Sequence, residues 1–157
     1  MNEISLTTLV PAAPEVVWPL LEDFFGIGNF HPYITSVDEL TDGKMGVGSS
    51  RRCHFNDGTH VVETIAEWYD KAGYRVDLSD YKLPLKWAQA EFRILESETG
   101  SETTEVRMTM RYQMKFGPLG TLMHYVMLRP MITSRFRNIL RGLADYASGL
   151  PVVKVAT

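Results

Sequence analysis

Three titratable side chains stand where acid–base or nucleophilic chemistry is conceivable. His31 precedes Pro32 in a turn-like segment, and an imidazole titrates near neutral pH, so it could act as a general acid or base or gate a pocket. Tyr112 carries a hydroxyl on an otherwise apolar strand face, where it needs a partner. Cys53 follows Arg52, and a neighbouring cation lowers a thiol pKa. The sequence favours plainer roles: His31 as a structural or exposed loop residue, and Cys53 as a small buried strand residue.

The same residue types argue against a metal site. His54, His60 and His124 show no ligand spacing with one another, and no carboxylate cluster lies near them. A single cysteine excludes internal disulfides and a multi-cysteine zinc site. The chain also has no Ser–His–Asp order, nucleotide-binding glycine loop or P-loop. We therefore expect no metal and no cofactor.

Methionines are concentrated in one stretch of the chain. Six of the eight are Met108, Met110, Met114, Met123, Met127 and Met131. The first three share one face of a predicted strand, and the last three recur every four residues, as on one face of a helix. Thioether chains are flexible and polarisable. The two groups fit either ordinary core packing or the wall of a cavity for a flat or greasy ligand.

Hydrophobic periodicity predicts an α+β domain. The predicted strands are 4–10, 35–40, 47–55, 59–68, 74–80, 86–95 and 102–116, and the helical segments are 14–24, 28–34 and 118–148. Short connections, such as the Asn56-Asp57-Gly58 turn and the polar segment 96–102, favour an antiparallel sheet. Pro130 predicts a kink or a split in the last helix. One helix cannot fill a strongly curved seven-stranded sheet, so the gap between them is a natural ligand cavity.

Alternation assigns the faces of only some strands. The last strand has an apolar face formed by Val106, Met108, Met110, Tyr112, Met114 and Phe116. The fourth predicted strand allows two inner sets, Val61 with Glu63 or a set ending at Trp68. The sixth allows a face starting at Trp87 or one starting at Ala88. Whichever of these two faces points outward could form a homodimer surface.

Composition indicates a single domain, with a core over 4–148 and a tail over 149–157 that we expect to fray. Of the 157 residues, 45% are hydrophobic and 11% aromatic, which disfavours disorder. There is no apolar run long enough to cross a bilayer and no secretory signal. We expect a cytoplasmic protein.

Charge is spread unevenly along the chain. Residues 1–100 carry 8 basic and 16 acidic side chains, whereas residues 101–157 carry 8 basic and 3 acidic ones. Pairing between an acidic sheet and a basic helix explains this, as would an anionic ligand or a membrane surface. The sequence pI of about 5.8 disfavours nucleic acid as a partner.

Six short motifs occur in a characteristic order. They are Asp23-Phe24-Phe25-Gly26, Asn29-Phe30-His31-Pro32, Gly48-Ser49-Ser50-Arg51, Asp57-Gly58 followed by Glu63, Leu83-Pro84 and Gly117-Pro118-Leu119-Gly120. Over residues 4–148 the chain resembles the SRPBCC (START-like, helix-grip) superfamily, and within it bacterial polyketide cyclase/dehydrase-like proteins. Ser50 departs from the aliphatic residue usual there. The resemblance implies a helix-grip fold: a curved seven-stranded antiparallel sheet around a long C-terminal helix, with two short helices between the first two strands.

The resemblance also implies that Arg51 and Glu63 point inward, with Arg51 sharing its face with Cys53 and Phe55. Such a pair could orient a polar ligand group or neutralise itself. The resulting ligand-binding candidates are Phe30, His31, Arg51, Cys53, Phe55, Glu63, Trp87, Met108, Met110, Tyr112, Met114, Met123 and Met127. No catalytic residue is assigned.

The leading hypothesis is binding of a small hydrophobic lipid-, polyketide- or isoprenoid-like molecule, with Arg51, Glu63 and Tyr112 orienting one polar or anionic group. The alternative is a polyketide cyclase or dehydratase that uses His31, Tyr112 or Glu63 as acid or base. A second alternative is a quinone or lipid chaperone at a membrane surface, without stable insertion, because an apolar stretch over 122–132 precedes three arginines.

Overall fold

The computed structural model describes residues 1–95 and 102–155; most of the predicted turn over 96–102 therefore lies outside the described residues. Seven antiparallel strands form one sheet in the order β1-β7-β6-β5-β4-β3-β2. The strands are β1 (Asn2–Val10), β2 (Ile34–Glu39), β3 (Ser50–Phe55), β4 (His60–Tyr69), β5 (Gly73–Ser79), β6 (Leu85–Ile94) and β7 (Thr104–Met114). The helices are α1 (Pro14–Glu22), the 3-10 helix η1 (Phe24–Asn29), α2 (Gly117–Met123), the π-helical η2 (His124–Leu128) and α3 (Arg129–Ala147).

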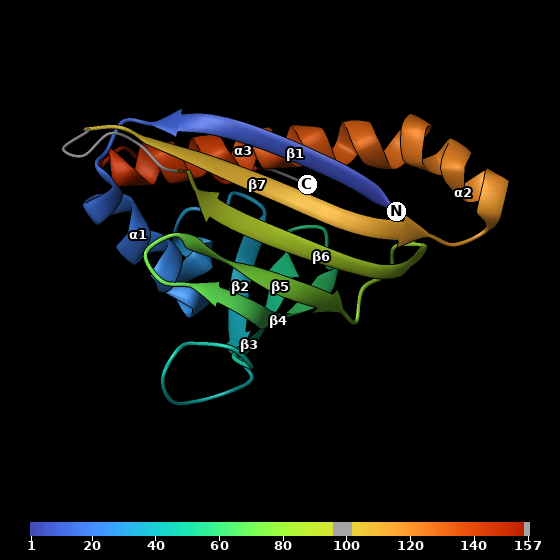
Figure 1. Cartoon of the computed structure of the whole chain (residues 1–157), viewed down its shortest axis with the longest axis horizontal. Coiled ribbons are helices and arrows are strands. Elements are labelled where there is room, and N and C mark those ends of the chain that lie inside the picture. The colour runs from blue at the N-terminus through green and yellow to red at the C-terminus, as the bar shows by residue number, and fades with distance from the viewer. Residues whose placement is uncertain (96–101, 156–157) are drawn as a thin grey trace.

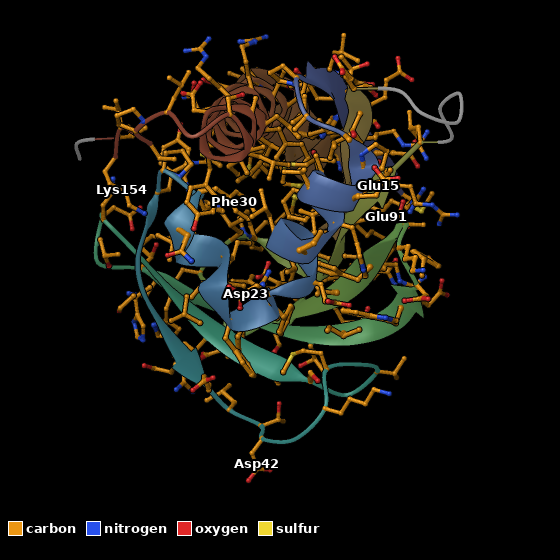
Figure 2. All side chains as sticks on the ribbon, turned by 90° about the vertical axis from the view of Figure 1, so that its left-hand side faces the viewer. Glu15, Asp23, Phe30, Asp42, Glu91 and Lys154 are labelled. Atoms are coloured by element: carbon orange, nitrogen blue, oxygen red, sulfur yellow. The ribbon has the colours of Figure 1, made fainter. Side chains whose placement is uncertain are left out.

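The sheet curves around the helices, as predicted. Strands β2 to β7 follow one another as neighbours, and β1 returns to pair with β7. Viewed from the end of the molecule, α3 lies inside the curve of the sheet, and α1 and η1 cover the end facing the viewer (Figure 2). At the opposite end, α2 extends beyond the strands (Figure 1). This arrangement confirms the predicted seven-stranded sheet with a long C-terminal helix.

The apolar face of β7 is confirmed over the strand itself. Val106, Met108, Met110, Tyr112 and Met114 are all buried. Phe116 departs from the prediction because the strand ends at Met114 and Phe116 adopts a left-handed backbone (φ 70°) before α2. Its ring is therefore 62% exposed.

Strand β4 resolves the choice between two inner sets by using part of each. Val61 and Ile65 are buried on the inner face. A bulge between Ile65 and Glu67 then shifts the register by one residue. Trp68 consequently reaches the inner face, where its ring stacks on Tyr74 at 6.0 Å. Simple alternation could not choose, because the strand changes phase halfway along.

Strand β6 turns the face that begins at Ala88 inward. Ala88 and Phe92 are buried, and Ala90 packs against the core. Trp87 therefore lies on the outer face, where its indole N–H donates to Gln113 Oε1 at 3.2 Å. The homodimer surface expected on the outward face of this strand would therefore be the face that contains Trp87. That homodimer stays a prediction.

The C-terminal helix is continuous and contains a π-helical turn just before Pro130, so Pro130 does not split it. Residues His124–Leu128 form a π-helical turn, and the Arg129 N–H bonds the carbonyl of His124, five residues back. Pro130 directly follows this turn, and because it has no N–H it cannot donate the next bond of the π-helical series. The extra residue in this turn breaks the predicted four-residue methionine stripe: Met131 faces the sheet side and Met127 is 58% exposed.

The two short helices between β1 and β2 lie earlier in the chain than predicted. The first ends at Glu22 rather than residue 24, and the second spans Phe24–Asn29 rather than 28–34, so most of its predicted range was wrong. Their apolar residues reach the core, with Leu21, Phe24 and Phe30 each 1% exposed. The backbone of α3 approaches this segment closely at Gly142. A Cβ at this position would lie only 2.2 Å from the Phe30 carbonyl oxygen. Gly142 permits this approach.

The described part of the C-terminal tail is hydrogen-bonded to the rest of the molecule, and its expected fraying stays a prediction. The Lys154 ammonium donates to the carbonyls of Gly28, His31 and Ile34 at 2.6, 2.9 and 2.9 Å. The Val155 N–H donates to the Pro32 carbonyl at 3.0 Å. These bonds fasten the tail over the connection between η1 and β2. Sequence reasoning could not foresee them, because a lysine beside valines has no characteristic spacing.

Candidate functional site

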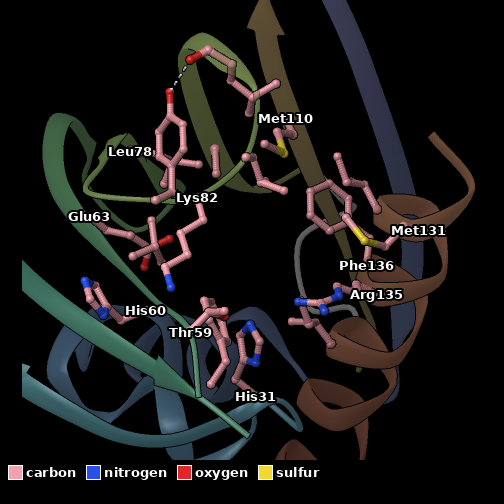
Figure 3. Close-up of a pocket in the computed structure, with 18 of the residues that line it drawn as sticks. His31, Thr59, His60, Glu63, Leu78, Lys82, Met110, Met131, Arg135 and Phe136 are labelled. Carbon is pink, nitrogen blue, oxygen red and sulfur yellow. Dashed lines mark hydrogen bonds between the residues drawn. The ribbon is translucent and has the colours of Figure 1, made fainter. Parts of the chain in front are cut away.

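A pocket of about 310 Å³ lies between the sheet and α3 (Figure 3). Its lining residues are His31, Phe55, Asp57, Thr59, His60, Val61, Glu63, Leu78, Tyr81, Lys82, Leu83, Leu85, Ala90, Met108, Met110, Met131, Ile132, Arg135, Phe136 and Ile139. They come from β3 to β7, from the turn between β3 and β4, from the loop between β5 and β6, from His31 after η1, and from one side of α3. The volume is at the lower end of the range typical of small-molecule sites.

The wall of the pocket is mainly apolar. Met108 and Met110 contribute from β7, and Ala90 contributes from the middle of β6. Ile132 and Phe136, four residues apart, form the facing wall on α3. The small side chain of Ala90 leaves space between sheet and helix that a larger residue would occupy. This wall can bind a hydrophobic molecule through burial and dispersion.

Polar side chains mark the rim where the pocket meets solvent. His60 and Arg135 have side chains 37% and 36% exposed, and Lys82 is also exposed. Arg135 lies 4.0 Å from an Asp57 carboxylate oxygen and over the ring of Tyr33. Lys82 forms no ion pair within residues 1–95 and 102–155. The rim therefore presents two cations, of which one lacks a carboxylate partner in that part of the chain.

Arg51 is directed inward, as the resemblance implied, but it neutralises Glu63 rather than reaching the pocket. The guanidinium is 1% exposed and contacts Glu63 Oε1 through Nε at 2.8 Å and Nη2 at 2.7 Å. It also donates to the Phe24 carbonyl and, at 3.4 Å, to the Tyr74 hydroxyl. Its central carbon lies 3.8 Å from the centre of the Phe24 ring. Through these contacts Arg51 links η1 to strands β4 and β5 and acts as an internal support of the fold.

Glu63 connects this support to the pocket. Its side chain is 15% exposed, and its Oε1 receives both Arg51 and the Cys53 thiol, the latter at 3.4 Å. Glu63 itself lines the pocket. A carboxylate held there accepts hydrogen bonds from a hydroxyl or amine and repels an anion. Near Arg51, the pocket therefore offers a ligand the Glu63 carboxylate, a hydrogen-bond acceptor, and not the guanidinium cation.

His31 reaches the pocket from the segment after η1. The Tyr33 N–H donates to His31 Nδ1 at 3.2 Å, so in the neutral ring the proton is on Nε2. Burial, followed by the positive charges of Arg51, Lys154 and Arg135, lowers the pKa of His31 to about 3. At neutral pH this imidazole is uncharged and offers one N–H donor.

Two other candidates are engaged within the protein. The Tyr112 hydroxyl and His124 Nδ1 form a buried hydrogen bond, which supplies the partner that the sequence required. Burial raises the pKa of Tyr112 to about 12 and lowers that of His124. Burial, followed by the Glu63 charge, raises the pKa of the Cys53 thiol. Cys53 is therefore a buried strand residue and not an activated nucleophile.

The structure brings together five of the thirteen predicted ligand-binding residues at the pocket. These are His31, Phe55, Glu63, Met108 and Met110. The remaining eight do not line it: Phe30, Arg51, Cys53, Trp87, Tyr112, Met114, Met123 and Met127. Phe30 packs edge-on against Phe92 in the core. Met114 is buried further along β7, and Met123 is half-buried beside the core.

Sequence reasoning overlooked much of the polar rim. Arg135 precedes Phe136, and the spacing of Ile132, Phe136 and Ile139 indicates the buried face of α3. An arginine next to the buried face of a helix could therefore have been predicted to lie at the pocket rim. Lys82 precedes the Leu-Pro loop and offered no such signal, because its place depends on the path of that loop. Within the described residues, no three His, Cys, Asp or Glu side chains are grouped as metal ligands would be.

Comparison with known families identifies the class of protein. Residues 1–148 match the family described as "Polyketide cyclase / dehydrase and lipid transport". The chain belongs to this family, which agrees with the resemblance seen in its motifs. No curated protein matches it.

Solved structures share the fold at low identity. Protein XoxI from Bacillus cereus is 20% identical, with a TM-score of 0.74 over 93% of this chain and 95% of that chain. A protein from Thermus thermophilus is 18% identical, with a TM-score of 0.74 over 94% and 98%. The di-domain ARO/CYC BexL from the BE-7585A biosynthetic pathway is 16% identical, with a TM-score of 0.74 over 92% of this chain and 46% of that one. These likenesses establish the fold alone.

Proposed function

We propose that this protein binds a small hydrophobic molecule carrying one polar or anionic group in the pocket between sheet and α3. The observation that carries the proposal is the apolar wall of Met108, Met110, Ile132 and Phe136 around a space of about 310 Å³. The family, whose description includes lipid transport, supports this class of ligand. The single, free cysteine fits a reducing compartment such as the cytoplasm.

The rim supports a specific orientation for the ligand. Lys82 and Arg135 are the cations that line the pocket, so an anionic group would sit at the solvent side. Glu63 and the neutral His31 would face the deeper part, where they can accept from or donate to a hydroxyl or carbonyl. This assigns the anion-binding role to residues other than Arg51, which is occupied by Glu63.

The alternative is a cyclase- or dehydratase-type enzyme using the same pocket. It is favoured by one observation: His31 is buried, neutral and lines the pocket, so its N–H could polarise a carbonyl without changing charge. An enzyme of this kind would lose turnover in a His31→Asn variant while retaining ligand affinity. A wild-type protein that binds such a substrate without converting it would favour the binding protein.

Two fluorescent probes test the binding proposal. Anilinonaphthalene sulfonate combines apolar rings with an anion, and phenylnaphthylamine has similar rings without the charge. We expect both to bind with 1:1 stoichiometry, and we expect a Lys82→Gln/Arg135→Gln variant to bind the sulfonate about tenfold more weakly with little change for the neutral probe.

A matched variant controls for net charge. Lys86→Gln/Arg137→Gln removes two exposed cations from the same parts of the chain, and neither residue lines the pocket. It should leave both affinities within about twofold. The proposal is wrong if neither probe binds the wild-type protein in a saturable way. Equal weakening by both double variants would instead overturn the assigned role of the rim.

A further inference from the structure

Six large apolar side chains are exposed to solvent in the region from Phe116 to Met127. These residues, which we call the apolar end, are Phe116, Leu119, Leu122, Tyr125, Val126 and Met127, each between 58% and 65% exposed. They lie on and around α2 and η2, which extend beyond the strands at one end of the molecule (Figure 1). Contiguous exposed apolar groups of this kind mark interaction surfaces.

Helical spacing divides this segment into two faces. Gly120, His124 and Leu128, four residues apart, are buried toward the sheet. Leu119, Leu122 and Val126, three and four residues apart, occupy the opposite side. An isolated surface helix normally places polar residues there. This helix instead presents apolar side chains to the outside, so its outer face is suited to a hydrophobic environment.

The charged side chains in the stretch of sequence that contains the apolar end are all of one sign. From Val106 to Ala144 the sequence contains no Asp or Glu. Lys115 and Arg129 flank the exposed side chains, are exposed themselves, and form no ion pair within residues 1–95 and 102–155. Apolar and aromatic residues bordered by free cations match the interface of an anionic bilayer, where rings and aliphatic chains enter the headgroup region and cations meet lipid phosphates.

The apolar end adjoins the rim of the pocket. The Lys115 N–H donates to the Pro84 carbonyl at 2.9 Å, which joins the start of α2 to the loop that contains Leu83. Leu83 is 36% exposed and lines the pocket. On the other side, Met131 lines the pocket one turn after Met127. A surface resting on the apolar end would therefore lie beside the pocket.

We propose that the apolar end docks peripherally on anionic lipid bilayers, with Leu119, Leu122 and Val126 entering the interface and Lys115 and Arg129 contacting headgroups. No helix among the described residues has the length and hydropathy to cross a membrane. The inference goes beyond the proposed function, because vesicle binding requires no molecule in the pocket.

Vesicle flotation tests the proposal on the full chain. We expect binding to vesicles in which about a third of the lipid is phosphatidylglycerol, at least about tenfold weaker binding to pure phosphatidylcholine, and a marked loss at about 0.5 M NaCl. A Leu122→Gln/Val126→Gln variant should bind the anionic vesicles at least about tenfold more weakly, because glutamine keeps helix propensity and removes the apolar contact.

A matched variant separates docking from general hydrophobicity. Leu9→Gln/Val47→Gln removes two aliphatic chains, 59% and 70% exposed, that lie outside the apolar end, and it should bind vesicles like the wild type. Light scattering on the same proteins reports self-association. The proposal is overturned if the wild type ignores anionic vesicles, or if the two double variants bind equally. Dimers that only Leu122→Gln/Val126→Gln dissociates, without vesicle binding, would overturn it in favour of a second copy of this chain.

Discussion

The two ends of the inner sheet surface are filled in different ways. At the end covered by α1 and η1, Phe24 packs edge-on against Tyr74 at 5.5 Å, and Trp18 packs against Trp68 at 5.3 Å. Toward the loop between β5 and β6, the side chains of β6 and β7 meet α3 across an open pocket. The same curved sheet is thus closed where short helices insert aromatic rings and hollow where only one helix faces it.

The two regions also use arginine differently. Arg51, in the closed region, has its guanidinium bound to Glu63, the Phe24 carbonyl and Tyr74. Arg135, at the pocket rim, is 36% exposed and lies 4.0 Å from its carboxylate neighbour. A buried and paired cation supports structure, whereas an exposed and loosely paired one is available to a ligand. Burial and partners, rather than residue type, separate the two roles.

The largest expected effect comes from breaking the closed region. Arg51→Met leaves the Glu63 carboxylate without its partner and removes the contact with the Phe24 ring. We expect a loss of about 3–5 kcal/mol in the free energy of unfolding, measured by urea denaturation.

The neighbouring residue provides the control. Arg52→Met removes an exposed arginine that lies 3.7 Å from Asp38, and it should cost less than about 1 kcal/mol. Arg51→Met/Glu63→Leu should recover part of the loss by removing the unpaired carboxylate. A loss below about 1 kcal/mol for Arg51→Met would contradict the supporting role.

Acid provides the next test, through His31. Its pKa is about 3 in the folded protein and 6.5 as the ordinary value, so between these values the unfolded chain binds the extra proton and stability falls as pH falls. From pH about 6.5 to pH about 4 this histidine should contribute a loss of about 3 kcal/mol. His31→Asn keeps an acceptor for the Tyr33 N–H and should remove that part of the pH dependence. If the free energy of unfolding varied with pH in the same way for both proteins, the lowered pKa of His31 would be refuted.

The smallest effect is expected at the tail. Lys154→Met removes three hydrogen bonds to carbonyls, but the residue is exposed, so we expect a loss of only about 1 kcal/mol. Amide hydrogen exchange should also quicken at Val155, whose N–H bonds Pro32. Lys86→Met, at another exposed lysine, serves as the control. Unchanged exchange at Val155 would show that Lys154 does not hold the tail.

The sequence predicted features that depend on local pattern and missed those that depend on long-range contacts. Alternation correctly placed Met108 and Met110 on the inner face of β7, because no bulge interrupts that strand. It could not settle β4, where a bulge moves Trp68 to the inner face. Trp87 was expected at the pocket and lies on the outer face, because the phase of β6 depends on its pairing with β7.

The candidate site shows the same division. The inward direction of Arg51 followed from the family motif, but its full use by Glu63 and the Phe24 carbonyl required the packing of η1 onto β3. Met127 does not share a helix face with Met131 as predicted, because the π-helical turn before Pro130 adds a residue to the helix. The role of Lys82 at the rim depended on the path of a loop.

The central claim, that the open region receives an apolar molecule, is tested most directly by filling it. Ala90→Leu adds bulk at the pocket wall, and Gln89→Leu adds a similar side chain to the outer face of the same strand. Titration with phenylnaphthylamine should show at least about tenfold weaker binding for Ala90→Leu and wild-type affinity for Gln89→Leu, with both proteins folded by circular dichroism. Wild-type affinity in a folded Ala90→Leu protein would contradict the account.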